Sequence, residues 1–360
     1  MRLKHHPVFR LSLLLGLLYL FFVSISLMSA SFKSFGGGFA EQLLTTTSNP
    51  FIGLLIGILA TSLVQSSSTT TSMTVALVAG NAIGLQGAIA IIIGANVGTS
   101  VTNTLVSVAH ISRTDEFKRA FSAATVHDFF NLLAISILFP LQVTTNALGI
   151  GARWLANGFS ELGGLEFANP LKAATQPAVE IIKDLTFDTG TIMLILALIF
   201  LFISLRYIVL NLKAAVIGKV EAFFSETLFK SPLRALLIGM VLTIMVQSSS
   251  ITTSLVVPLA GAGILNLRQI FPFTLGANVG TTITAMLAAL VTSNITAVTV
   301  AFAHVLFNVF GIFIIWPARR VPIFLAEWLS NRAVQNKIIP LLYVASVFFL
   351  IPLVLMFIFG

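Results

Sequence analysis

The chain is 360 residues long, with 57% of them hydrophobic and only 9% charged. Soluble globular proteins carry charge on roughly 25% of their residues, so this composition excludes a soluble domain and indicates an integral membrane protein. The chain contains no cysteine, which excludes disulfides and thiolate metal sites, and its formal net charge is +8.

The basic residues are unevenly distributed. Fifteen of the 20 lysines and arginines fall in the segments 1–10, 110–120, 206–234 and 318–337, whereas 140–188 holds three basic and five acidic residues. Loops rich in Lys and Arg mark the cytoplasmic side of a membrane. We therefore attribute the net charge to membrane orientation and expect no nucleic-acid partner. The pattern predicts a multi-pass protein with a cytoplasmic N-terminus.

Seven stretches are apolar enough, and long enough, to cross a bilayer as helices, which takes about 20 residues each. In chain order they are 8–30, 86–109, 118–139, 189–211, 268–290, 294–316 and 338–359. The first resembles a signal peptide, with basic residues before it and "LMSAS" at its end. Its apolar run is long for a signal sequence, so we expect a retained helix.

Two further apolar stretches, 50–80 and 232–265, are broken by largely polar, uncharged blocks. The first block reads "QSSSTTTS" and begins at residue 65, and the second reads "QSSSITTS" and begins at residue 247. The apolar parts on either side of the first block are only 15 and 12 residues long. Segments this short are more often re-entrant than spanning, so we expect helical hairpins that enter and leave on one side.

These landmarks recur in order along the chain. The two polar blocks are 182 residues apart, and "GANVGTSVT" at 94 recurs as "GANVGTTIT" at 276 with the same offset. "HDFFN" at 127 recurs as "HVLFN" at 304, an offset of 177. The order indicates a duplication. With a re-entrant hairpin each half crosses the membrane an odd number of times, so the second half is inverted.

We predict an all-α integral membrane protein of two inverted-topology repeats, each with a re-entrant helical hairpin and an interrupted transmembrane helix. Inverted repeats with interrupted helices are typical of secondary transporters, whose binding sites lie at the bilayer midplane. The expected parts are a first repeat over 1–140 with its hairpin at 50–80, an extracytoplasmic loop over 141–188, a second repeat over 189–317 with its hairpin at 232–265, and an interfacial segment with a C-terminal helix over 318–360.

The polar motifs have the chemistry of an ion site. At the first hairpin tip the second half-helix should begin near Ser67 or Ser68, and its free N–H groups and positive dipole end favour an anion. Carbonyl groups around Leu63 to Gln65 suit a hard cation such as Na⁺. In "GANVGT", Asn96 can cap a helix or contact a ligand, and Thr99 can begin the second half of an interrupted helix.

A packing role is the alternative for these small and polar residues. Gly94 and Gly98 permit a helix break, but a G-x-x-x-G pair alone more often forms a helix-packing face. We favour a binding site because the polar block occurs twice, each time followed 29 residues later by "GANVGT". No Lys or Arg lies near either motif, so an anion bound there needs another positive charge, which Na⁺ would supply.

The ionisable residues inside the predicted spans are few. Asp128 is the only acidic one, next to His127, and an intramembrane ionisable residue marks function unless it serves a structural hydrogen bond. The phosphate-loop ending GK[ST] and the hydrolase motif G-x-S-x-G are both absent. We therefore expect no enzyme. An intramembrane Ser/His hydrolase with His127 and His304 as bases is a distant alternative, and a passive channel is another.

Taken together, the paired "QSSS" motifs, "GANVGTSVTNT" and "ATVHDFFN" resemble the type II sodium-dependent phosphate cotransporters, whose bacterial members match this chain best in size. The resemblance covers most of 50–139 and 232–316. It implies Na⁺-coupled symport of inorganic phosphate into the cell by alternating access, with Na⁺ as coupling ion and no cofactor. It also implies a homodimer in the plasma membrane, here the bacterial inner membrane. Another oxyanion, such as sulfate, or a dicarboxylate stays open as the substrate.

The resemblance also implies a site made by both hairpin tips and both "GANVGT" motifs. The implied substrate ligands are Gln65, Ser66, Ser67, Ser68, Asn96, Thr99, Gln247, Ser248, Ser249, Ser250, Asn278 and Thr281. Within that set, the expected Na⁺ ligands are Gln65, Ser66, Thr99, Gln247, Ser248 and Thr281. A supporting or coupling role is expected for His127, Asp128 and His304, and Na⁺ is the only metal expected.

Overall fold

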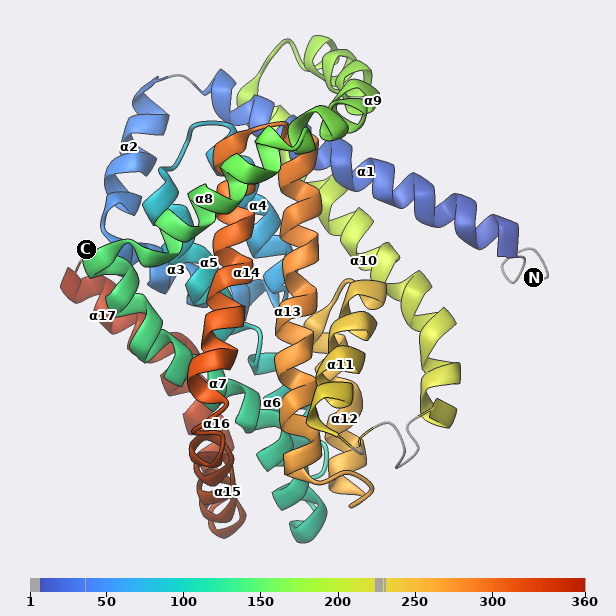
Figure 1. Ribbon diagram of the computed structural model, residues 1–360, viewed down its shortest axis with the longest axis vertical. Helices are drawn as coiled ribbons and strands as arrows, with labels where there is room; N and C mark the ends of the chain where they lie inside the picture. Colours follow the sequence, from blue (N-terminus) through green and yellow to red (C-terminus); the bar gives the residue numbers. More distant parts are fainter. Residues whose placement is uncertain (1–6, 36, 224–228, 230, 360) are drawn as a thin grey trace.

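The computed structural model describes residues 7–35, 37–223, 229 and 231–359, and every regular element in them is helical (Figure 1). Parts of the basic segments 1–10 and 206–234 lie outside the described residues. The helices are α1 (Pro7–Ser34), α2 (Gly37–Ser48), α3 (Pro50–Val64), α4 (Ser67–Ala79), α5 (Leu85–Gly98), α6 (Val101–Val108), α7 (Thr114–Thr145), α8 (Ala147–Glu161), α9 (Gly164–Leu185), α10 (Gly190–Phe223), α11 (Pro232–Val246), α12 (Ser249–Gly261), α13 (Leu267–Thr292), α14 (Ile295–Ile315), α15 (Arg320–Gln335), α16 (Ile339–Ala345), a π-helical turn (Ser346–Leu350) and α17 (Ile351–Phe359).

Seven helical segments in the described part of the chain are long and apolar enough to cross a membrane, and they confirm the seven predicted stretches. The third is longer than expected, because α7 continues beyond the apolar stretch at both ends. The segments are Phe9–Ser34, Leu85–Val108, Thr114–Thr145, Gly190–Leu212, Leu267–Thr292, Ile295–Ile315 and Ile339–Phe359.

The two halves share one kind of close helix packing. A methyl group added to Gly57 of α3 would collide with the carbonyl of Ile91 in α5, and one added to Gly94 of α5 would collide with the carbonyl of Leu54 in α3. Only glycine lets the two backbones approach this closely. The same contacts recur 182 residues later between α11 and α13, through Gly239, Phe273, Gly276 and Leu236.

This packing corrects the prediction of two interrupted helices. In the first half, α5 ends at Gly98 and α6 begins at Val101, so the chain is briefly interrupted at Thr99. In the second half, α13 is continuous, and the expected interruption is wrong. The glycines of "GANVGT" serve the packing role that the sequence left as the alternative. Gly280 of α13 lies against α11, as Gly98 of α5 lies against α3. This packing role requires no break in α13.

The segment expected as a loop over 141–188 contains two helices. One face of α8 is buried at Leu148, Ala152 and Ala156, and α8 packs against α14. Figure 1 shows α8 in front of α14, and α9 at the top of the molecule. The sequence analysis also missed α2, which meets α3 at an angle of 99°.

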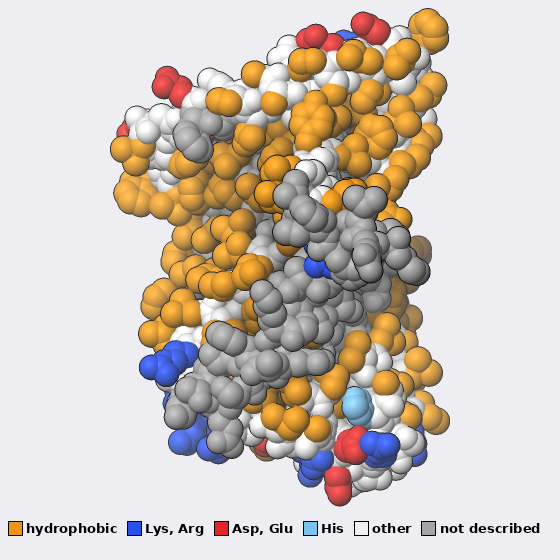
Figure 2. All heavy atoms as spheres, turned by 90° about the vertical axis from the view of Figure 1, so that its right-hand side faces the viewer, with side chains coloured by type: hydrophobic (Ala, Val, Ile, Leu, Met, Phe, Trp, Pro, Cys, Tyr) orange, Lys and Arg blue, Asp and Glu red, His pale blue; other side chains and the backbone are white. Residues whose placement is uncertain are grey.

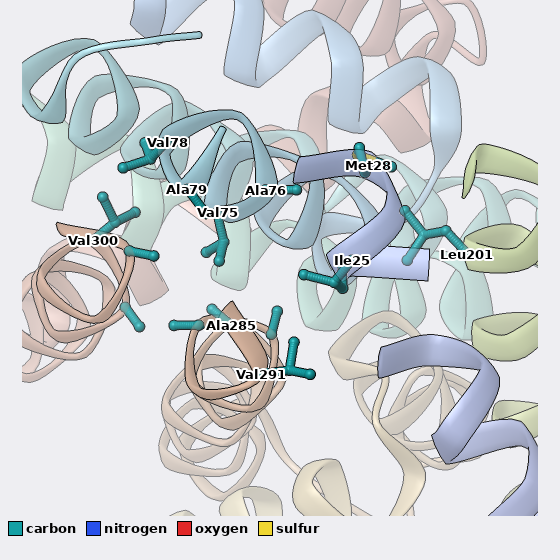
Figure 3. Close-up of a cluster of buried hydrophobic side chains, with 14 of the residues drawn as sticks. Ile25, Met28, Val75, Ala76, Val78, Ala79, Leu201, Ala285, Val291 and Val300 are labelled. Carbon is teal, nitrogen blue, oxygen red and sulfur yellow. The ribbon is translucent and has the colours of Figure 1, made fainter. Parts of the chain in front are cut away.

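The largest core buries α4 among the long helices. Figure 3 shows side chains from α1, α4, α10, α13 and α14 gathered in one cluster. One fully buried member from each of these helices is Ile25, Val75, Leu201, Ala285 and Val300. Short helices with irregular ends are tolerated at membrane depth where protein surrounds them. The half-helix that follows the first polar block is enclosed in this way.

Charged side chains collect at the two ends of the molecule. Figure 2 shows acidic side chains at the upper end, most of the visible Lys and Arg at the lower end, and hydrophobic side chains between them. This is the distribution expected of a protein whose middle lies in lipid.

Candidate functional site

The first polar block forms a tight connection between two helices. Gln65 ends α3 in a left-handed conformation (φ 59°), and its N–H donates to the carbonyl of Thr61 at 2.8 Å. Ser66 is extended and caps α4, its hydroxyl accepting from the N–H of Thr69 at 3.2 Å. A serine cap satisfies one of the free donors at a helix start. The prediction that the second helix begins near Ser67 is confirmed.

The second polar block has the same geometry. Gln247 ends α11 with φ 56°, and its N–H donates to the carbonyl of Thr243 at 2.7 Å. Ser248 is extended and caps α12 by accepting from the N–H of Ile251 at 3.4 Å. The two tips are therefore equivalent in conformation as well as in sequence.

The side-chain amide of each tip glutamine forms hydrogen bonds through both its nitrogen and its oxygen. The amide nitrogen of Gln65 donates to the carbonyl of Ser62 at 3.2 Å, and its oxygen accepts from the hydroxyl of Thr102 at 2.9 Å. In the second half, the oxygen of Gln247 accepts from the hydroxyl of Thr284 at 2.8 Å. Both threonines were missed as site residues, although each ends the matching "GANVGTSVT" or "GANVGTTIT" stretch.

The two halves meet at these tips. The hydroxyl of Ser68 donates to the carbonyl of Gln247 at 3.3 Å, so the start of α4 lies against the end of α11. The hydroxyl of Ser250 donates to the carbonyl of Thr99 at 3.5 Å, so the start of α12 lies against the interruption after α5. Both serines are buried. Residues 179 and 151 positions apart along the chain thus form one polar centre.

The first residue of each half-helix, Ser67 in α4 and Ser249 in α12, is buried. Neither hydroxyl makes a hydrogen bond within the described part of the chain. The first N–H groups of a helix have no partner within it. Both half-helices therefore present polar groups that are free to bind a ligand.

The two "GANVGT" asparagines are bound to histidines from the opposite halves. The Nε2 atom of His127 lies 2.6 Å from Oδ1 of Asn278, and Nε2 of His304 lies 3.4 Å from Oδ1 of Asn96. All four residues are buried. An amide oxygen can only accept, so each histidine donates from Nε2. Each contact uses one of the two lone pairs of an asparagine oxygen, and the side chains cross-link the halves.

Asn131 links the two motifs more directly. Its amide nitrogen donates to the carbonyl of Asn96 at 2.9 Å, and its oxygen accepts from the amide of Asn278 at 2.9 Å. It was not predicted, although it ends "HDFFN" and recurs at the end of "HVLFN" as Asn308. Within the described residues, the amide of Asn308 donates only to the carbonyl of His304, at 3.0 Å. The histidine networks of the two halves therefore differ.

Asp128 is fully buried, and only one of its oxygens has partners in the described part of the chain. Oδ2 accepts from the hydroxyl of Tyr343 at 3.1 Å and from that of Thr104 at 3.5 Å, while Oδ1 has none. No described Lys or Arg lies within ion-pair distance of it. Tyr343 belongs to α16, outside the duplication, so the repeat gives no signal for this contact.

Two predicted site residues are engaged mainly with their own helices. The hydroxyl of Thr99 donates to the carbonyl of Ala95 at 3.0 Å, and that of Thr281 donates to the carbonyl of Ala277 at 3.1 Å. Such back-bonding is the ordinary behaviour of threonine in a helix, and it leaves lone pairs on the hydroxyl free to accept. The described residues contain no group of three His, Cys, Asp or Glu that could hold a metal ion.

Comparison with known proteins agrees with this architecture. A family model described as Na⁺/Pi-cotransporter matches residues 20–163 and 199–315. The chain belongs to this family. The matched ranges contain both polar blocks, both "GANVGT" motifs and both histidines of the cross-links. Membership in a transporter family also favours transport over the hydrolase alternative.

Similar curated members of the Na⁺/Pi-cotransporter family are animal proteins. Sodium-dependent phosphate transport protein 2B of Homo sapiens and that of Pongo abelii are each 33% identical to the chain over 444 aligned residues. Sodium-dependent phosphate transport protein 2A of Rattus norvegicus is 32% identical over 424 residues. The alignments cover 95–96% of this chain but 64–66% of the relatives, so the chain spans about two thirds of their length. No solved structure matches the chain.

Proposed function

We propose that the chain is a secondary active transporter, which couples Na⁺ entry to the uptake of inorganic phosphate by alternating access. The relatives named above are sodium-dependent phosphate transport proteins. The observation that carries the proposal is the meeting of two equivalent hairpin tips, through Ser68 with Gln247 and Ser250 with Thr99. A site shared between repeats can be opened to either side when the repeats move relative to each other.

The proposed topology is two inverted repeats with re-entrant hairpins. The helices α3 and α11 are each 15 residues long, and α4 and α12 are each 13. A helix of 15 residues is about 22 Å long, shorter than the ~30 Å hydrocarbon core. If these helices do not span, α1, α5 with α6, and α7 cross in the first half, and α10, α13 and α14 cross in the second. Three crossings per half invert the second half.

We place phosphate at the starts of α4 and α12. Buried hydroxyls and free first-turn N–H groups converge there, and a helix start favours an anion. The full proposed substrate set, from both tips and both "GANVGT" motifs, is Gln65, Ser66, Ser67, Ser68, Asn96, Thr99, Gln247, Ser248, Ser249, Ser250, Asn278 and Thr281.

We place Na⁺ beside the phosphate, on side-chain and carbonyl oxygens of the tips. Hard cations prefer such oxygens, and the proposed ligands are Gln65, Ser66, Thr99, Gln247, Ser248 and Thr281. No described Lys or Arg donates a hydrogen bond to these residues. A buried anion without a nearby cation is very costly. Each ion therefore makes the burial of the other tolerable, which is the physical basis of obligatory coupling.

Asp128 belongs to the coupling machinery in this proposal. Its Oδ1 atom is buried and has no partner in the described residues, although a carboxylate can accept several hydrogen bonds or bind a cation. An unpaired buried carboxylate is costly unless it is neutralised or meets a cation. We assign Asp128 to Na⁺ coupling, and His127 and His304 to support of the "GANVGT" asparagines.

The proposed function also implies an oligomeric state, a membrane and an orientation. We propose a homodimer in the plasma membrane, with the basic ends of the spans and the N-terminus in the cytoplasm. The size match to bacterial members of the family supports the bacterial inner membrane as its location.

Equilibrium binding tests the coupled site separately from transport. Purified protein would be incubated with radiolabelled phosphate in Na⁺ buffer and in K⁺ buffer. We expect saturable binding only in Na⁺, displaced by arsenate and not by sulfate. Equal binding in K⁺ would contradict the charge compensation, and displacement by sulfate or a dicarboxylate would favour the alternative substrates.

A further inference from the structure

A cavity of about 420 Å³ at the basic end of the molecule is lined by Arg268, Arg319, Arg320 and Glu327, together with apolar residues that include Trp316. The three arginines come from two separate parts of the chain: Arg268 lies at the start of α13, and Arg319 and Arg320 lie where α15 begins. None of them forms an ion pair within the described part of the chain. With one glutamate against three arginines, the cavity carries a net positive charge.

The cavity lies where two predicted spans end. Arg268 is the second residue of the span Leu267–Thr292, and Arg319 and Arg320 follow shortly after the span Ile295–Ile315. The start of one predicted span and the end of the next therefore lie beside the same cavity. The ends of spanning helices lie at the level of the lipid headgroups.

Aromatic packing holds one of the arginines in place. The ring of Trp316 stacks on that of Phe271 with centroids 6.4 Å apart and an interplanar angle of 2°. The guanidinium of Arg319 lies 5.1 Å from the centroid of the Trp316 ring. Tryptophan is typical of membrane interfaces, and a cation above its face is attracted to the ring. Arg319 is thus oriented by the wall of the cavity.

An apolar groove of about 520 Å³ adjoins this cavity. It shares Pro232 and Trp316 with the arginine cavity and continues along Leu233, Ile312 and Phe313. Leu233 and Phe313 are 66% and 73% exposed, on the flanks of α11 and α14. Surface of this kind at membrane depth contacts acyl chains. A polar, cationic cavity and an apolar groove therefore form one continuous surface.

We propose that this surface binds one anionic phospholipid, with its phosphate on Arg268, Arg319 and Arg320 and an acyl chain in the groove. Arginine matches the planar, bidentate contacts that phosphate groups favour. A free anion would use only the arginines, whereas a phospholipid also covers the groove that shares their wall. The site is separate from the polar centre between the hairpin tips.

Native mass spectrometry of delipidated protein, titrated with dioleoyl phosphatidylglycerol or dioleoyl phosphatidylcholine, tests this proposal. We expect one phosphatidylglycerol molecule to be retained and phosphatidylcholine to be lost. Each substitution among R268Q, R319Q and R320Q should weaken retention by about fivefold, since a basic residue near the surface contributes on the order of 1 kcal/mol. R332Q, an exposed arginine of α15 outside the cavity, is the matched control and should retain the lipid.

Two further arms separate a phospholipid from a soluble anion. Excess inorganic phosphate should leave the bound phosphatidylglycerol in place, and dihexanoyl phosphatidylglycerol should bind more weakly than the dioleoyl form. Displacement by inorganic phosphate, equal retention of phosphatidylcholine, or unchanged retention by the triple arginine variant would overturn the proposal. If the triple variant does not fold, the single variant R320Q gives the same comparison.

Discussion

At the residue scale, Gln65 and Gln247 occupy equivalent positions in the two halves. Each ends a helix in a left-handed conformation, and each presents its amide oxygen to a threonine from the neighbouring "GANVGT" helix. Left-handed backbone is uncommon outside glycine and asparagine, and it collects at functional sites. Asn146 and Ser293 also end helices in this conformation, so the site role of the two glutamines stays a prediction that substitution can test.

Gln65→Ala and Gln247→Ala should each lower phosphate uptake by about tenfold or more, because each removes a hydrogen-bonding amide from the shared site. Folding should change little, since Gln65 is exposed and Gln247 is only partly buried. Uptake into proteoliposomes, normalised to folded protein, measures the effect. Gln86→Ala, an exposed glutamine at the start of α5, is the control. Wild-type uptake by either tip variant would contradict a site shared by both halves.

Asp128→Asn should raise the Na⁺ concentration for half-maximal uptake by roughly tenfold, because a bond to a charged group is worth about 1.5–3 kcal/mol. Asparagine keeps the shape and can still accept from Tyr343. The readout is the Na⁺ dependence of uptake. Tyr343→Phe, which removes one of the two partners of Oδ2 and leaves the carboxylate, is the control for a structural role. If Asp128→Asn leaves the Na⁺ dependence unchanged and lowers only the melting temperature, the carboxylate is structural.

At the scale of elements, the pairs α3 with α5 and α11 with α13 hold the hairpins in place. The length and apolar composition of the stretches predicted the spans well, because these two properties decide whether a helix can cross a bilayer. The sequence alone could not decide whether the "GANVGT" glycines break a helix or let two helices pack closely, because glycine favours both through its lack of a side chain. The contact of Gly94 with Leu54 decides for packing, and α13 stays continuous.

Gly57→Ala and Gly239→Ala should destabilise the protein, because each new methyl group meets a backbone carbonyl of the partner helix. Overpacking of a tight interface typically costs about 1–3 kcal/mol. The melting temperature in detergent is the measurement. Gly16→Ala in α1, where an added methyl group meets no atom within 4 Å, should not lower it. Equal effects of all three substitutions would show that the close helix approach is not what matters.

Several elements near the site gave no usable sequence signal. The amphipathic helix α8 was hidden in a segment assigned as a loop, because its buried face becomes apparent only against α14. The contact between Tyr343 and Asp128 joins residues 215 positions apart and has no counterpart in the other half. By contrast, Thr102, Thr284 and Asn131 stand inside repeated motifs, so a stricter comparison of the two halves would have found them.

At the scale of the whole molecule, charge distribution and internal repetition set the proposed orientation. Most of the visible Lys and Arg gather at one end, where some acidic side chains also lie, whereas the other end is mainly acidic (Figure 2). The duplication was visible in the sequence because motif spacing survives where most side chains have changed. The sequence could not identify the contacts between the halves. The structure shows two of them, between His127 and Asn278 and between His304 and Asn96.

The cysteine-free chain allows a direct test of orientation. Thr189→Cys, in the connection before α10, should react with a membrane-impermeant maleimide in intact cells. Ser112→Cys, in the basic connection before α7, should react only after the cells are permeabilised, because basic loops stay in the cytoplasm. Both positions are exposed. The reverse pattern would invert the proposed topology.

Radiolabelled phosphate uptake into proteoliposomes, driven by an inward Na⁺ gradient and repeated with K⁺ in place of Na⁺, tests the central proposal most directly. We predict uptake only with Na⁺, inhibited by arsenate and not by sulfate, because the polar tips provide no fixed cation to neutralise the phosphate. Equal phosphate uptake with K⁺ in place of Na⁺ would contradict Na⁺-coupled symport at the meeting point of the two hairpins. Phosphate accumulation that does not depend on an inward Na⁺ gradient would contradict it as well.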